Sequence, residues 1–265
     1  MDTDATNIKA LFFDVDGTLV SFRTHRIPTS AVEAIHRAKE RGAKVFIATG
    51  RPMSIINNID EIQPLVDGYI TTNGARCIMD GKTIGSARLP QADVDNYLHQ
   101  AAIHGYAAMM ESEGGICVHQ DNEEAWHIFH DMLDIDYRSI QQPEPQVLAY
   151  PILQITPIIN QAQQDKLMPL MPGCKATRWY PAFCDVTAVN SDKGYGLEAF
   201  ARYTGIPLSQ MMAFGDGGND TPMIRKAGIG VAMGNAGDDV KAAANYVTTS
   251  VDDDGIARAL AHFGF

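Results

Sequence analysis

The chain has 265 residues, enough for one large domain or two modest ones, and its 45% hydrophobic and 20% charged content excludes a disordered or collagen-like polymer. Its 32 acidic and 21 basic side chains give a net charge of −11, which argues against nucleic acid or an anionic membrane as a partner. No stretch approaches the ~20 apolar residues of a membrane helix, and the acidic start lacks the basic region of a secretory signal, so we expect a cytoplasmic protein.

The first third of the chain alternates short apolar runs with helical patterns. Strands are predicted over 9–13 and 44–48, and a helix is expected to begin after Pro28 and end near Gly42. Pro52 is expected to open a second helix that runs through Ile59. This alternation is typical of parallel strands joined by crossover helices.

The middle of the chain has a different pattern. Asp80-Gly81 predicts a two-residue hairpin between strands at 76–79 and 82–84. Beyond it, helical patterns at 91–104, 123–132 and 161–168 are mixed with candidate strands at 107–110, 116–119, 148–156 and 175–179. The turn at Gly114-Gly115 indicates that the first two of these strands pair antiparallel. This section is typical of a separate α+β domain.

The last third returns to the alternating pattern, with helices expected at 193–203, 220–227, 238–244 and 256–262 and strands at 211–214, 229–232 and 246–248. The sequence therefore predicts an α/β fold, in which both ends of the chain build one Rossmann-like, doubly wound parallel sheet. A smaller α+β domain is inserted between them. We place the core at 1–82 and 188–265 and the inserted domain at 83–187.

Asp14 and Asp16 are the sharpest local feature of the sequence. They follow the first predicted strand, at the edge where open α/β sheets bind their ligands, and their spacing of two directs both carboxylates to one side. Clustered carboxylates are commonly stabilised by a divalent cation, and oxygen ligands favour Mg²⁺. An acidic turn that caps a helix is the alternative for this pattern alone.

A second acidic cluster follows the predicted strand at 211–214. It contains Asp216, flanked by glycines that permit close approach to a ligand, and then Asn219 and Asp220. The last two residues can orient metal-bound water or simply cap the next helix.

Two further segments have residues suited to an anion. Thr49 and Gly50 end the second strand, where a hydroxyl and a backbone N–H can hold a phosphate oxygen. Lys193 opens a later helix and can supply a positive charge, although an ordinary surface lysine is the alternative.

Together, these four segments resemble, in order and spacing, the motif set of the haloacid dehalogenase (HAD) superfamily, and most closely the Cof-type subclass IIB sugar phosphatases. The resemblance runs the whole length of the chain, and the gap between Thr49 and Lys193 is where that family inserts its cap domain. It implies a HAD core with an inserted α+β cap of type C2B.

The resemblance also implies roles for individual residues. Asp14 would attack phosphorus and form an aspartyl-phosphate, and Asp16 would act as general acid and then as general base. Thr49, Gly50, Lys193 and Asn219 would bind the phosphoryl group. Mg²⁺ would be held by the residues of the two acidic clusters, namely Asp14, the carbonyl of Asp16, Asp216 and, in supporting roles, Asn219 and Asp220.

Substrate choice is expected in the inserted domain, which in this family contacts the part of the substrate beyond its phosphate. Arg178, Trp179 and Tyr180 are the candidates, because an aromatic face stacks on a sugar and arginine binds hydroxyl or phosphate oxygens. Core packing of the two aromatic residues is an equally good alternative.

The sequence and the resemblance predict a Mg²⁺-dependent phosphatase that hydrolyses a small phosphorylated metabolite, with a hexose or other sugar phosphate as the expected substrate. A phosphotransferase or mutase that passes the phosphoryl group to a second sugar is an alternative, as is a non-catalytic phosphosugar-binding regulatory module. The oligomeric state stays open, and a monomer is one option.

Overall fold

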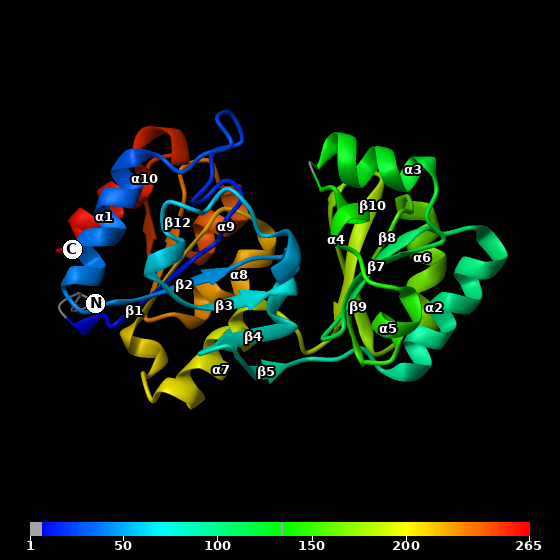
Figure 1. Cartoon of the computed structure of the whole chain (residues 1–265). Helices are drawn as coiled ribbons and strands as arrows, with labels where there is room; N and C mark the ends of the chain where they lie inside the picture. Colours follow the sequence, from blue (N-terminus) through cyan, green and yellow to red (C-terminus); the bar gives the residue numbers. More distant parts are fainter. Residues whose placement is uncertain (1–6, 134) are drawn as a thin grey trace. The chain divides into compact units, whose positions relative to one another are not determined.

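An eight-stranded and a five-stranded sheet organise the chain in the computed structural model, which describes residues 7–133 and 135–265 (Figure 1). Each sheet belongs to its own compact unit. Unit 1 consists of residues 7–51, Ile56–Gly85 and Asp192–Phe265, and unit 2 consists of Pro52–Ile55 and Ser86–Ser191. The predicted boundaries at 82/83 and 187/188 lie a few residues from two of these junctions, and the assignment of separate functions to the two units stays a prediction.

The sheet of unit 1 is mainly parallel. Its strands, from edge to edge, are β13 (Tyr246–Val247), β12 (Ile229–Ala232), β11 (Met211–Gly215), β1 (Ala10–Phe13), β2 (Lys44–Ala48), β3 (Val66–Thr71), β4 (Arg76–Met79) and β5 (Lys82–Ser86). The strands from β13 to β3 run parallel, and β4 pairs antiparallel with β3. Asp80 and Gly81 both have positive φ at the predicted hairpin.

Helices cover both faces of this sheet, because successive residues of the buried strands point to opposite sides. Phe13 lies in a core with α1 (Thr29–Glu40) and α10 (Gly255–His262) on one face. Phe12 stacks on Phe46 and meets Phe200 of α7 (Lys193–Thr204) on the other, where α8 (Thr221–Lys226) also packs. The short α9 (Asp238–Ala243) packs against α8 through a small cluster around Val240. The predicted doubly wound architecture is confirmed.

Unit 2 has an antiparallel sheet in the order β7 (Gly115–His119), β6 (Ala108–Ser112), β8 (Ile152–Pro157), β10 (Phe183–Ala188) and β9 (Cys174–Tyr180). Two helices, α2 (Gln91–His104) and α6 (Gln161–Leu167), pack on one face through Tyr97 and Leu167. The other face contacts a second core around Phe129 and Tyr137. That core is built from α3 (Glu123–Trp126), a π-helix (His127–Met132) and α4 (Tyr137–Ile140).

The structure differs from the predicted elements in several places, and the strand β3 was not predicted. Pro52 is followed by a single 3₁₀ turn, Met53–Ile55, and not by a long helix. Residues 144–148 form α5 (Glu144–Leu148), so β8 begins later than the strand expected from 148. The strand β10 was missed, because Asp185 and Thr187 interrupt its apolar run although both are buried in this sheet.

The four cysteines are free and buried. Within residues 7–133 and 135–265, no helix combines the length and the apolar character needed to cross a bilayer. The acidic first residues lie outside the described part of the chain.

Candidate active site

The candidate site lies at the carboxyl edge of the sheet of unit 1. Asp14 follows β1, Thr49 follows β2 and Asp216 follows β11. Because β1 lies between β2 and β11 and all three run parallel, their carboxyl ends meet at one edge. Lys193 joins them from the first residue of α7. Residues about 200 positions apart in the sequence therefore come together through the sheet topology.

A buried ion-pair network is the centre of this site. The Lys193 Nζ donates to Asp14 Oδ1 at 2.6 Å and to Asp220 Oδ1 at 2.5 Å, and all three side chains are buried. Burial by itself disfavours the charged amine, but the two carboxylates outweigh it and raise the pKa of Lys193. The two carboxylates therefore favour the charged form of Lys193, and the surface-lysine alternative is wrong because the side chain is buried.

Asp14, Asp216 and Asp220 place carboxylate oxygens within 4.8 Å of one another. Burial, and then repulsion from Asp220, raises the pKa of Asp14 well above its ordinary value. The same two causes raise the pKa of Asp216 to about 6. The positive charge of Lys193 is thus not enough to offset the negative charges of Asp14 and Asp216. A cluster that offers only oxygen ligands suits a hard divalent cation such as Mg²⁺. The residues present fit the predicted metal.

Asp216 is held in place by two donors that the sequence analysis did not identify. Thr18 Oγ1 donates to Asp216 Oδ1 at 3.0 Å. The Asn235 Nδ2 donates to Asp216 Oδ2 at 3.1 Å and to the Gly17 carbonyl at 2.8 Å. Gly17 has a φ of +81°, and a Cβ at this position would collide with the Asp216 carboxylate. The chain therefore needs glycine where the two acidic loops meet.

Asp220 organises the second acidic loop. Its Oδ2 accepts from the backbone N–H groups of Asp216 at 3.0 Å and Gly217 at 2.9 Å, while its Oδ1 binds Lys193. It makes no side-chain cap bond to α8, so the simple N-cap alternative is wrong for this residue. With both oxygens engaged by protein donors, Asp220 is better suited to position Lys193 and Asp216 than to bind a cation directly.

Asp16 forms a bidentate ion pair with Arg51, a residue that the sequence analysis did not assign to the site. Arg51 Nε lies 2.9 Å from Asp16 Oδ2, and Arg51 Nη2 lies 2.7 Å from Asp16 Oδ1. Arg51 Nη1 also donates to Asn57 Oδ1 at 2.5 Å. Both Asp16 oxygens are thus occupied, and a proton-transfer role requires this pair to open.

Three of the predicted phosphate-binding residues, Thr49, Gly50 and Asn219, lie in a second group of contacts at this edge. Thr49 is buried, and its Oγ1 accepts from the Arg51 N–H at 3.1 Å. The Asn219 Nδ2 donates to Asn73 Oδ1 at 3.1 Å, and the same Asn73 amide lies against Gly50. Asn73 was missed in the sequence, although an Asn-Gly pair directly after a buried strand is a turn signal at the ligand-binding edge.

The predicted substrate-selecting residues are the last three residues of β9 in unit 2. Arg178 donates through Nε to Gln164 Oε1 at 3.0 Å and through Nη1 to the Pro181 carbonyl at 2.8 Å. The Tyr180 ring stacks on Phe183, which matches the packing alternative for this residue. The side chain of Trp179 lies outside the described part of the structure. A role of these three residues in substrate choice stays a prediction.

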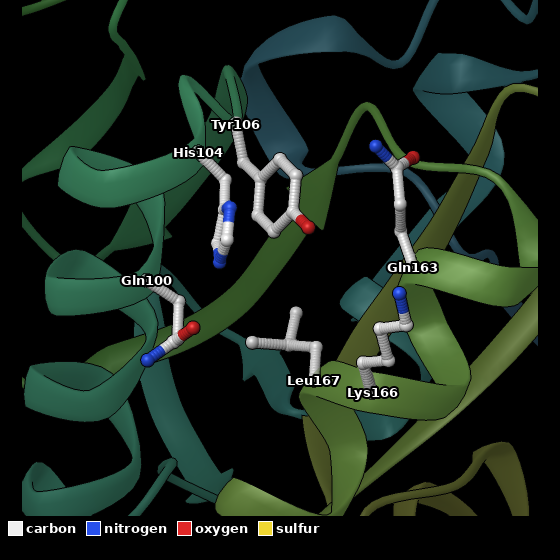
Figure 2. A pocket seen from close by; sticks show the side chains of 6 residues that line it. All are labelled: Gln100, His104, Tyr106, Gln163, Lys166 and Leu167. Atoms are coloured by element: carbon white, nitrogen blue, oxygen red, sulfur yellow. The ribbon is translucent and has the colours of Figure 1, made fainter.

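A surface pocket of about 230 Å³ lies elsewhere in unit 2, between α2 and α6. Figure 2 shows His104 and Tyr106 side by side, with Gln100 on the same side of the pocket and Gln163, Lys166 and Leu167 of α6 on the other. None of the predicted site residues lines this pocket. The predicted catalytic, phosphate-binding and metal residues lie instead at the acidic edge of unit 1.

Comparison with known proteins decides the family. A sequence model of the haloacid dehalogenase-like hydrolases matches residues 11–260. The chain belongs to this hydrolase family. The solved structure described as the HAD subclass IIB sugar phosphatase BT4131 is similar with a TM-score of 0.88 and 47% identity, over 97% of this chain and 99% of that one. The predicted family and fold class are confirmed.

Curated members of the HAD hydrolase family also match along the whole chain. YkrA of Bacillus subtilis (strain 168), a phosphatase by name, is 29% identical over 97% of this chain and 98% of its own. YcsE of the same organism, named as 5-amino-6-(5-phospho-D-ribitylamino)uracil phosphatase, is 26% identical over 97% and 96%. These names agree with the predicted phosphatase class of HAD enzyme.

Proposed function

We propose that this protein hydrolyses small phosphomonoesters of the sugar-phosphate class in a Mg²⁺-dependent reaction in the cytoplasm. The observation that carries the proposal is the buried Asp14–Lys193–Asp220 network with Asp216 beside it. A nucleophilic carboxylate, a buried cation and a further acidic group at one sheet edge are the components of phosphoryl transfer through an aspartyl-phosphate.

Asp14 supplies the nucleophile in the proposed first step. One of its carboxylate oxygens attacks phosphorus, and the bond from phosphorus to the substrate oxygen breaks. Asp16, released from Arg51 and protonated, gives its proton to that leaving oxygen. The products of this step are the free alcohol and a phosphoryl group on Asp14.

Water completes the reaction in the proposed second step. Asp16, now a carboxylate, takes a proton from the water as the water oxygen attacks phosphorus. The bond between phosphorus and the Asp14 oxygen breaks and inorganic phosphate leaves. Thr49 Oγ1, the Gly50 N–H and Lys193 Nζ donate to phosphoryl oxygens in both steps, with Asn219 in a supporting position.

The proposed Mg²⁺ would be held by Asp14, the Asp16 carbonyl and Asp216, with Asn219 and Asp220 in support. When bound, the cation offsets the charge of the carboxylates and of the phosphate together. The anionic substrate is thereby accommodated in an acidic protein. Lys193 contributes to the same end through its 2.6 Å bond to Asp14 Oδ1.

The sugar-phosphate substrate class is supported by BT4131, the structural relative described as a sugar phosphatase. Arg178, Trp179 and Tyr180 stay the proposed selecting residues. We would measure phosphate release from a panel of phosphorylated metabolites with purified protein in EDTA and after addition of Mg²⁺. Hydrolysis of hexose phosphates only with Mg²⁺ is the expected result, and metal-independent hydrolysis or inactivity on the whole panel would refute the proposal.

Asp14→Asn is the sharpest single change, because it keeps the size of the side chain and removes the nucleophile. We expect turnover to fall by at least about 10³-fold while the protein stays folded. Asp80→Asn, at the exposed hairpin of the same unit, is the matched control and should retain activity. Steady-state rates and circular dichroism measure the two effects. An Asp14→Asn enzyme that keeps most of its activity would remove Asp14 from this role.

A further inference from the structure

Three consecutive residues after β3 have a left-handed backbone. Thr72, Asn73 and Gly74 have φ values of 57°, 49° and 88°, and they form a single 3₁₀ turn. Only one of them is glycine, and a β-branched residue such as Thr72 is a genuine outlier in this region. All three are buried. Strain of this kind persists only where the surrounding structure imposes it, and it concentrates at functional sites.

The turn is fixed to the end of β2 by two backbone hydrogen bonds. The Asn73 N–H donates to the Thr49 carbonyl and the Thr72 N–H donates to the Arg51 carbonyl, both at 3.1 Å. These two bonds bracket Gly50, whose backbone N–H is a proposed phosphate donor. The Asn73 side chain fills the space beside Gly50, where an added Cβ would lie 3.1 Å from Asn73 Oδ1.

The same turn contacts the two other segments that carry proposed phosphate ligands. Asn73 Oδ1 accepts from Asn219 Nδ2 at 3.1 Å. Gly74 lies directly against the backbone of Asp192, the N-cap residue that precedes Lys193, so that a Cβ at Gly74 would collide with the Asp192 carbonyl. The left-handed path of the chain is what permits this close approach.

We propose that the Thr72–Gly74 turn sets the geometry of the phosphate-binding segments, with Asn73 as their positioning residue. The inference rests on the proposed function, because the three segments it joins are those given to the phosphoryl group. Asn73 acts through its neighbours: it places the Gly50 backbone and the Asn219 amide. Donors to a phosphoryl group must converge with sub-ångström accuracy, and a misplacement of about 1 Å can cost about 100-fold.

The turn is separate from the contacts that position the acidic cluster. Asp216 is held by Thr18 and Asn235, and Asp14 by Lys193. Loss of the Asn73 amide should therefore weaken phosphate binding far more than Mg²⁺ binding, in which Asn219 has only a supporting place. A residue needed only for folding would lower both together.

Asn73→Gly tests this separation, because glycine accepts the left-handed backbone and removes only the amide. Asn58→Gly is the matched control: Asn58 has a similar φ of 61° and is exposed. We would titrate Mg²⁺ into the metal-free full chain and inorganic phosphate into the Mg²⁺-saturated full chain by calorimetry, and record thermal unfolding. We expect Asn73→Gly to bind phosphate about 10-fold or more weakly, with Mg²⁺ affinity within about twofold, and Asn58→Gly to match the wild type in both.

A second variant guards against poor folding of Asn73→Gly. Asn73→Asp keeps the size of the side chain and its tolerance of left-handed φ, but adds a negative charge beside Gly50, so it should also weaken phosphate binding with little change for Mg²⁺. Wild-type phosphate affinity in both Asn73 variants, or a parallel loss of phosphate and Mg²⁺ binding, would overturn the inference. A wild-type protein that binds no phosphate at all would overturn the proposed function and the role of the turn with it.

Discussion

The two units arrange their buried polar side chains in different ways. In unit 1, Asp14, Asp216 and Asp220 come from separate loops and surround the single ammonium group of Lys193. In unit 2, the buried polar group lies on neighbouring strands, where Asp185 Oδ1 accepts from Thr156 Oγ1 at 2.9 Å and from Gln154 Nε2 at 3.2 Å. Unit 1 thus buries several charged groups close together, whereas in unit 2 neutral donors bind one oxygen of the Asp185 carboxylate.

The difference follows from sheet topology. At the carboxyl edge of a parallel sheet, loops from distant parts of the chain converge, so charges of both signs can be placed in one small volume. In an antiparallel sheet, the neighbours of a side chain are set by register, and a buried residue faces whichever partners the adjacent strands supply. A charged cluster is costly to bury, and its presence in unit 1 fits the phosphoryl-transfer chemistry proposed for that edge.

Lys193→Met should have the largest effect on stability and activity, because it leaves Asp14 and Asp220 buried without their cation. We expect the free energy of unfolding at pH 7 in EDTA to fall by about 3–5 kcal/mol and phosphatase activity to be lost. Lys226→Met is the matched control, because Lys226 pairs with Glu198 on a more exposed part of the same unit; surface pairs contribute only about 0–1 kcal/mol. Urea unfolding measures both variants, and equal small losses would contradict a central role for Lys193.

Asp216→Asn should have a smaller effect whose sign depends on the metal. Burial raises the pKa of Asp216 to about 6 in the folded chain from an ordinary 3.8, so the ionised group opposes folding of the metal-free protein at pH 7. We expect Asp216→Asn to raise the melting temperature in EDTA at pH 7, and this gain to shrink as the pH falls through about 6 and the wild-type carboxyl takes up its proton. In excess Mg²⁺ the wild type should be the more stable protein.

Asp252→Asn is a control that should change the stability of the metal-free protein in the opposite direction. The Ser21 hydroxyl, and then Arg23, holds the pKa of the exposed Asp252 below its usual range, so this carboxylate favours folding at neutral pH. Its variant should be slightly less stable than the wild type with or without Mg²⁺. Melting curves that show the same metal response for both variants would remove Asp216 from the proposed cation site.

The contrast between the units also explains what the sequence could predict. Asp14, Thr49 and Asp216 were found because each directly follows an apolar strand, and strand ends are local signals. Arg51, Asn73 and Asn235 were missed because their roles depend on side-chain contacts between segments far apart: Asn235 meets the Gly17 carbonyl across 218 positions. No periodicity or spacing in one segment encodes such a contact.

In unit 2, the sequence was insufficient to assign some of the strands correctly. The sheet register brings Asp185 beside Thr156, but in the sequence Asp185 resembles a surface residue that ends a strand. The same reasoning placed the beginning of β8 too early, because Leu148 ends a short helix and the apolar run continues past it. Such residues can be assigned to strands only once it is known that both faces of this small sheet are buried.

Arg178→Ala should have the smallest effect of these substitutions, and it tests whether unit 2 contributes to substrate choice. The guanidinium is held by Gln164 and the Pro181 carbonyl, and its Nη2 is buried without a hydrogen-bond partner among the described residues. We expect the variant to change kcat/KM among sugar phosphates by several-fold while hydrolysis of p-nitrophenyl phosphate stays near the wild-type rate. Arg138→Ala is the matched control, since Arg138 binds Asp121 on the surface of the same unit and stacks over Trp126. Equal losses on sugar and aryl substrates would mean that Arg178 only stabilises β9, because a residue that contacts the sugar has nothing to bind in the aryl ester.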